Sequence, residues 1–131
     1  MKFQPDKMDG VNAVQAHTPD SITILGTTWR QSVLVPSRGQ VLTWDCRSFD
    51  ELEAEHFETI LALEPELVIF GSGRKLRFPA PALCRALIQQ RVGIESMDTG
   101  AACRTYNILV SEGRRVVGAF LIESDRGPGH L

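Results

Sequence analysis

Residues 97–116, with the sequence MDTGAACRTYNILVSEGRRV, place an acid, a thiol and a guanidinium within seven residues. A helix is expected to begin there, after Asp98 or Thr99. A cysteine near a helix N-terminus and an arginine can become a reactive thiolate. The alternative is that Cys103 is a small buried hydrophobe. It falls on one apolar helical stripe, which comprises Ala102, Cys103, Tyr106, Leu109 and Val110. Nucleophilic catalysis also needs a base, and no histidine is near in sequence, so we favour the buried side chain and predict no catalytic residue.

The other face of the same predicted helix carries Arg104 and Asn107. Arg104 could form a salt bridge with Asp98 and so fix the start of the helix. Alternatively, its guanidinium could face a cleft and bind an anion with two hydrogen bonds. The spacing alone leaves both interpretations open.

A second polar segment, GSGRKLRFP at residues 71–79, follows an apolar run that is typical of a buried strand. Gly71 and Gly73 are therefore expected at the carboxyl end of a strand, where ligand crevices form in α/β sheets. Glycine backbone groups there can bind an anion, and Arg77 would add positive charge. The dinucleotide pattern GxGxxG fails because residue 76 is leucine, and the phosphate-loop pattern lacks its GK[ST]. A simple turn and an anion site both remain possible.

These two segments need a scaffold that places one strand end beside one helix start. After residue 48 the sequence predicts helix and strand in alternation: helices over 48–64, 79–92 and 99–112, and strands over 66–71, 93–98 and 114–124. Ser48 and Glu51 form a capping-box pattern for the first helix, and Pro65 ends it. Alternation of this kind favours βαβ-type units with parallel strands.

The N-terminal third has a different pattern. Two short strands are predicted on either side of the turn TPDS, a third over residues 29–36 and a fourth over 41–44, which together make an antiparallel meander. The predicted fold is therefore a single compact α/β domain over residues 11–123. It combines a mixed sheet that carries this meander with the βαβ-type C-terminal half. Residues 1–10 and 124–131 are predicted to be a flexible arm and a flexible tail.

The composition limits the classes of function. The chain has 131 residues, 43% hydrophobic and 23% charged, with a net charge of −2, as expected for one globular domain. The low net charge argues against nucleic-acid binding. Residues 1–66 hold 5 basic and 11 acidic side chains, whereas residues 67–131 hold 9 and 5. The basic half could contact an acidic partner, or the charges could simply be a mixed solvated surface.

Cysteine and histidine usage argues against metal and disulfide chemistry. The three cysteines form no CxxC pair, and the three histidines lack metal-ligand spacing. We therefore predict no metal and no cofactor. The N-terminus shows no signal-peptide pattern, and no apolar run approaches the roughly 20 residues of a membrane span. A cytoplasmic location is predicted.

The sequence resembles the family known as domain of unknown function 498, which includes mitochondrial complex I assembly factor 3 and the adipogenesis-associated domain protein. The resemblance covers residues 10–123 and is strongest in PELVIFGSGRKLRFP and in GIESMDTGAACRTYNILVSEGRRVVGAFLI. It implies a compact α/β domain with no established enzyme activity and a role in assembly through protein contact. The matching positions imply a shared cleft made of Gly71, Gly73, Arg77, Asp98, Thr99, Cys103, Arg104 and Asn107.

Two functions follow from these observations. The leading hypothesis is a non-catalytic binding or assembly module that contacts a protein partner through its basic C-terminal half. The alternative is a protein that binds a small anionic ligand, or a weak enzyme, with its cleft between the 71–78 loop and the helix start at 98–107. Both residue sets must then meet in space.

Overall fold

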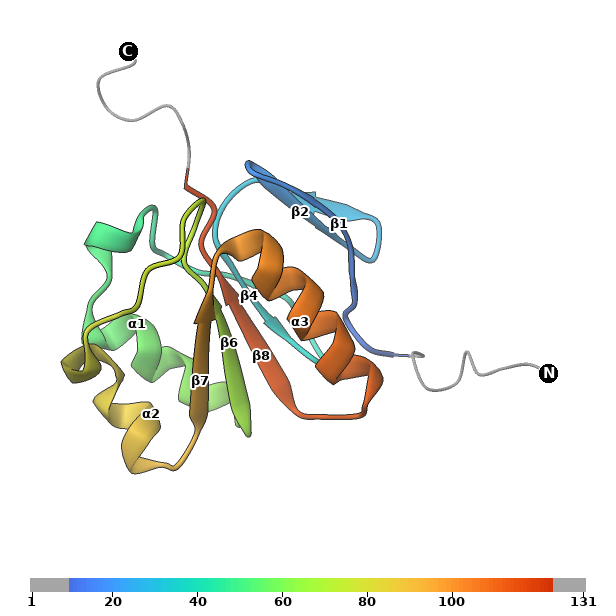
Figure 1. The fold of residues 1–131 in the computed structure, drawn as a ribbon. Helices are drawn as coiled ribbons and strands as arrows, with labels where there is room; N and C mark the ends of the chain where they lie inside the picture. The colour runs from blue at the N-terminus through green and yellow to red at the C-terminus, as the bar shows by residue number, and fades with distance from the viewer. Residues whose placement is uncertain (1–9, 124–131) are drawn as a thin grey trace, which may run out of the picture.

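The computed structural model describes residues 10–123 as two sheets and a set of helices in layers (Figure 1). A five-stranded mixed sheet in the order β5-β4-β8-β6-β7 lies at the centre. Its strands are β4 (Val33–Pro36), β5 (Leu42–Thr43), β6 (Leu67–Gly71), β7 (Gly93–Met97) and β8 (Val116–Phe120). A second, antiparallel sheet contains β1 (Val14–Thr18), β2 (Ser21–Ile24) and β3 (Thr27–Trp29). The α/β fold class is confirmed.

Parallel pairing supports the predicted βαβ units. β6 pairs in parallel with both β7 and β8, with Gly71 opposite Met97 on one side and Phe120 on the other. Helix α2 (Arg85–Gln89), preceded by the 3-10 helix η4 (Pro81–Cys84), connects β6 to β7, and α3 (Thr99–Ser111) connects β7 to β8. β8 is buried along its whole length, as expected for a strand covered on both faces.

Each face of the central sheet has its own hydrophobic core. Helix α3 and the three-stranded sheet cover one face, where the Tyr106 and Phe120 rings meet edge to face at 5.6 Å. α1 (Ala54–Glu58) and α2 cover the other face, where Phe57, Phe70 and Trp44 pack together. The side-chain amide of Asn107 binds both the N–H and the C=O of Val14, each at 2.8 Å, and so fastens β1 to α3.

The N-terminal meander has three strands rather than the predicted four. The predicted strand over residues 29–36 is two strands, β3 and β4, which belong to different sheets. β4 pairs with β5 and, on its other side, antiparallel with β8. All its residues are buried, because the central sheet has a core on each face: Val33 and Val35 lie in one core and Leu34 in the other. Ser32 fixes the break, because its C=O accepts from the Trp44 N–H and its hydroxyl accepts from the Ile122 N–H.

The prediction of one helix over residues 48–64 is wrong. The segment contains a 3-10 helix η2 (Phe49–Glu51), α1, and a second 3-10 helix η3 (Thr59–Leu63). Ser48 makes no capping bond, and Leu52 is extended and buried, which interrupts the helix. The capping box is instead formed by Glu53 and His56. The predicted helix over 79–92 is likewise short, because η4 occupies its first turn.

The first nine residues and residues 124–131 lie outside the described residues. The predicted arm and tail, and with them the domain boundaries, stay predictions.

Candidate functional site

The glycine turn after β6 and the start of α3 do meet. The Gly73 N–H donates to the Thr99 hydroxyl at 2.9 Å, and the Thr99 N–H donates to the Gly73 carbonyl at 2.9 Å. The same hydroxyl donates to the Leu121 carbonyl at 2.8 Å. One buried threonine therefore joins the turn after β6, the start of α3 and the segment that follows β8.

This junction explains two of the glycines. A Cβ on Gly71 would lie 2.8 Å from the Thr99 Oγ1 and 3.0 Å from its Cα, closer than real Cβ contacts. Gly73 has a φ of 101°, a left-handed conformation that favours glycine, and a Cβ there would collide with the carboxylate of Glu123. The GxG pattern is thus required by the turn itself.

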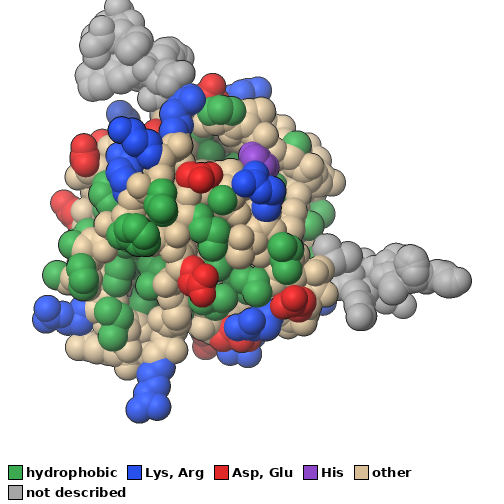
Figure 2. Space-filling model, viewed as in Figure 1, with side chains coloured by type: hydrophobic (Ala, Val, Ile, Leu, Met, Phe, Trp, Pro, Cys, Tyr) green, Lys and Arg blue, Asp and Glu red, His purple; other side chains and the backbone are tan. Residues whose placement is uncertain are grey.

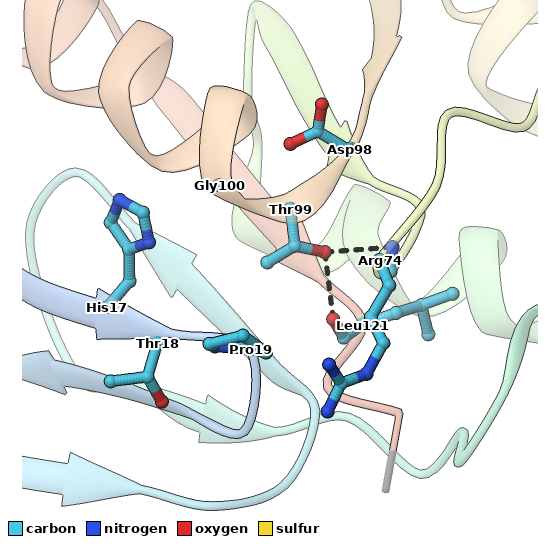
Figure 3. A pocket seen from close by; sticks show the side chains of 9 residues that line it. His17, Thr18, Pro19, Arg74, Asp98, Thr99, Gly100 and Leu121 are labelled. Carbon is cyan, nitrogen blue, oxygen red and sulfur yellow. Dashed lines mark hydrogen bonds between the residues drawn. The ribbon is translucent and has the colours of Figure 1, made fainter. Parts of the chain in front are cut away.

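A cavity of about 370 Å³ opens beside the junction (Figure 3). It lies between the tip of the β1–β2 hairpin, the turn after β6 and the first turn of α3. Its lining residues are His17, Thr18, Pro19, Gly73, Arg74, Asp98, Thr99, Gly100 and Leu121. Volumes of this order are typical of small-molecule sites.

The charged groups around the cavity have defined partners. Asp98 is the N-cap of α3, and its carboxylate accepts from the Ala101 N–H at 2.9 Å. Arg74 forms a salt bridge with Asp20 at 2.6 Å between Nη2 and Oδ1. The His17 ring lies over the start of α3, with Cε1 3.3 Å from the position that a Cβ on Gly100 would take. Acidic and basic groups therefore face the same cavity (Figure 3).

Only three of the eight predicted cleft residues line this cavity, namely Gly73, Asp98 and Thr99. Gly71 packs directly behind Thr99. Arg77 points elsewhere: its Nη2 donates to the Ser72 carbonyl at 2.9 Å and to Glu123 at 2.7 Å. Its guanidinium also lies 4.7 Å above the Phe49 ring. Arg77 holds the loop together.

The remaining three predicted residues lie along α3. Cys103 is 1% exposed within the core, and burial raises the pKa of its thiol to about 12, which opposes thiolate formation. Arg104 is exposed, and among residues 10–123 no ion pair joins it to Asp98. Asn107 binds the backbone of β1. None of the three lines the cavity.

Sequence reasoning missed the contribution of the β1–β2 hairpin. His17, Thr18 and Pro19 form one wall of the cavity, although their turn is far from α3 in the sequence. The signal available was the TPDS turn with a histidine beside it, but nothing in the sequence says where that turn packs. Leu121 was also missed, because its contribution follows from its position after a parallel strand.

Within the described part of the chain, no group of three or more histidine, cysteine, aspartate or glutamate side chains is placed to hold a metal ion. No helix within residues 10–123 is both long and apolar enough to cross a membrane.

The central mixed sheet and the small antiparallel sheet form a compact α/β domain that resembles a solved domain described as Mth938-like. A crystal structure of a Bordetella parapertussis protein matches the chain with a TM-score of 0.83 and 34% identity, covering 87% of this chain and 98% of that one. A Bordetella pertussis solution structure described as a Mth938-like domain matches with a TM-score of 0.82 and 28% identity, covering 100% and 98%.

The chain belongs to the family described as "Protein of unknown function (DUF498/DUF598)", whose model matches residues 14–121. It is also 34% identical over 112 residues to the mouse NADH dehydrogenase (ubiquinone) 1 alpha subcomplex assembly factor 3. That match covers 83% of this chain and 59% of the relative, and for the bovine counterpart the second share is 48%. The chain therefore spans about half the length of these relatives.

Proposed function

We propose that the chain is a protein-binding module that assists the assembly of another protein complex, and that residues 72–80 form its contact loop. The relatives named as assembly factors support this role. The observation that carries the location is the exposure of two large apolar side chains on this loop. Phe78 is 70% exposed and Leu76 is 53% exposed. Exposed apolar groups that lie together are typical of binding surfaces.

The contact loop is held firmly from the inside. The Ser72 hydroxyl lies 2.6 Å from the Lys75 carbonyl and accepts from the Arg77 N–H at 3.0 Å. The Arg77 side chain turns inward to Glu123, while Leu76 and Phe78 on either side of it turn outward. A fixed loop loses little conformational entropy when it binds. More of the free energy gained by burying its apolar side chains therefore appears as affinity.

The chemistry of the loop also indicates the kind of partner. Phe78 is an exposed aromatic side chain, a type that is enriched at protein interfaces. Lys75 is exposed between Arg74 and Leu76, so the loop combines apolar area with positive charge. An apolar surface with an acidic rim on a partner protein would complement it.

The test is an affinity capture from an extract of the source cells, with the immobilised chain and two variants. Phe78→Ser removes the most exposed aromatic side chain of the loop. Leu25→Ser is the matched control, because Leu25 is 62% exposed but lies between β2 and β3. We expect Phe78→Ser to lose proteins that the wild type and Leu25→Ser both retain. Retention of the same proteins by all three would reject the contact loop.

A second candidate function is the binding of a small anionic ligand in the 370 Å³ cavity. The observation that favours it is that both predicted motifs contribute to the lining, through Gly73 and Thr99. Arg74 and His17 add basic side chains, and the start of α3 adds the positive end of the helix dipole. The proposed site therefore shares only Gly73, Asp98 and Thr99 with the predicted cleft and includes the hairpin.

Thermal-shift measurements with phosphate, nucleotides and small carboxylates test this candidate. A ligand at about 100 times its Kd stabilises the folded chain by about 2.7 kcal/mol. We expect Arg74→Ala to abolish the shift, and Arg104→Ala, outside the cavity, to preserve it. A shift that survives Arg74→Ala would remove this site from consideration, as would a panel without any shift.

A further inference from the structure

Strand β7 forms one edge of the central sheet, and two of its five residues direct their backbone groups away from the sheet. Among residues 10–123, β6 is its only neighbour in the sheet. The Gly93 N–H donates to the Glu66 carbonyl, and the Met97 carbonyl accepts from the Ser72 N–H. Since successive residues of a strand alternate, Ile94 and Ser96 direct their N–H and C=O groups outward. Within residues 10–123 no hydrogen bond satisfies these outward groups.

The two faces beside this edge differ in chemistry. Ile94 packs towards the core beneath α1 and α2, whereas Met97 packs towards the core beneath α3. Glu95 lies two residues before Met97 and therefore on the same face of the strand, so its exposed carboxylate lies on the α3 side. Both α2 and α3 contact β7, and each carries an exposed isoleucine, Ile88 at 57% and Ile108 at 59%.

The surface around the edge combines apolar area with acidic charge. In Figure 1 β7 lies at the front, and Figure 2 shows the same view with hydrophobic side chains gathered over β7, α2 and α3. Acidic side chains lie among them (Figure 2). Open backbone groups, apolar neighbours and a negative charge thus occur together.

We propose that the outer edge of β7 accepts an extended segment of a partner protein as a sixth strand. Addition of a strand to a sheet edge gives affinity through backbone hydrogen bonds and specificity through alternate side chains. The segment alternates apolar side chains, which lie on the α2 side beside Ile94, with basic side chains, which lie on the α3 side opposite Glu95. This site goes beyond the contact loop at residues 72–80 and does not depend on it.

Charge selects this occupant over a second copy of the chain. Two copies of the chain could pair through antiparallel β7 strands. Such a pair uses every outward N–H and C=O group of Ile94 and Ser96 only when Ile94 of one copy lies opposite Ser96 of the other. That register places the two Glu95 carboxylates opposite each other on the same face, which is destabilising. A charge on an edge strand also protects against non-specific pairing. A basic side chain converts this repulsion into attraction.

The probe is a labelled nine-residue peptide in which lysine and valine alternate. Two control peptides replace every lysine by glutamate, or keep the composition but place the valines together. The readout is binding to the full chain, together with residue-specific amide exchange by NMR. We expect the alternating lysine peptide to slow exchange at Ile94 and Ser96 by about tenfold or more. The control peptides should bind at least about fivefold more weakly, since each lacks one part of the recognition.

Four variants sharpen the test. Ser96→Pro removes an outward N–H that lies outside the β6–β7 ladder, so it should fold yet bind about tenfold more weakly. Ser96→Ala keeps the N–H and should bind normally. Glu95→Lys should reverse the preference towards the glutamate peptide. Phe78→Ser should leave peptide binding unchanged, which separates this proposal from the contact loop.

The proposal is overturned if the lysine peptide does not bind, or if it binds while Ile94 and Ser96 exchange as fast as in the unbound chain. Equal binding by Ser96→Pro and Ser96→Ala also overturns it. The exchange measurement on the wild-type chain decides the matter even if Ser96→Pro fails to fold.

Discussion

The hydroxyl of Thr99 connects three segments that are far apart in the sequence, and its removal should destabilise the fold. In Thr99→Val the shape of the side chain is kept while the oxygen is lost. The Gly73 N–H then loses its acceptor at 2.9 Å and the Leu121 carbonyl loses its donor at 2.8 Å. Thr99 is 7% exposed, so water reaches these groups poorly.

The magnitude follows from the two bonds. A buried group left without its partner costs about 1–3 kcal/mol, and a hydrogen bond contributes about 1 kcal/mol net. We therefore expect Thr99→Val to lower the free energy of unfolding by about 2–4 kcal/mol, a large fraction of the 5–15 kcal/mol typical of a domain. Urea denaturation followed by circular dichroism measures it as a lower midpoint at unchanged slope.

Thr105→Val is the matched control, because it makes the same replacement on the same helix. Within residues 10–123 the Thr105 hydroxyl has no hydrogen bond, so this variant should change the free energy of unfolding by about 0.5 kcal/mol or less. Equal effects of the two variants would refute the connection assigned to Thr99. Faster amide exchange at Gly73 in Thr99→Val alone would place the loss at the junction.

Three further predictions concern the same region and one surface pair. Cys103 should resist iodoacetamide in the native chain at pH 8, because burial raises its pKa to about 12, and labelling as fast as in urea would contradict its burial. Gly71→Ala should lower the free energy of unfolding by about 1–3 kcal/mol, since its Cβ would press on Thr99, and an unchanged urea midpoint would argue against that contact. Arg114 holds the pKa of Glu66 below its ordinary value by hydrogen bonding. The wild type should therefore lose its stability advantage over Glu66→Gln as the pH falls from 6 towards 3, and a constant difference between their thermal midpoints would refute this.

The elements with complete local signals could be predicted from the sequence. Helix α3 begins after Asp98, whose carboxylate caps it as expected, and it ends before Gly113. The parallel order of β6, β7 and β8 follows from short apolar runs that alternate with helices. In each case the residues that decide the structure are neighbours in the chain.

The elements that depend on distant partners could not be predicted. Ser48 and Glu51 have the spacing of a capping box, yet Glu53 and His56 form it, because Leu52 leaves the helical conformation to enter the core. β4 resembles the end of a meander strand, but its pairing with β8 is set across more than 80 residues. Local patterns carry no information about such pairings.

In the candidate site too, features set by residues close in the sequence could be predicted, whereas the directions of single side chains could not. The two motifs lie together because β6 and β7 are parallel neighbours, so the turn after β6 and the helix that follows β7 start at the same edge of the sheet. The sequence could not indicate which arginine of the loop faces the cavity. Arg74 does so, because Gly73 reverses the chain at a positive φ, while Arg77 is drawn to Glu123 on the far side of that turn.

Gly73 lies between the cavity and the contact loop at residues 72–80, and both depend on it. Its N–H and C=O bind Thr99 beside the cavity, whereas a Cβ would strike Glu123 and approach Arg77 at 3.1 Å. The cavity wall and the support of the contact loop are therefore built on the same two peptide groups. A substitution at Gly73 should disturb both together, so the two proposed functions can be separated only by variants at side chains that lie clear of this turn, such as Phe78.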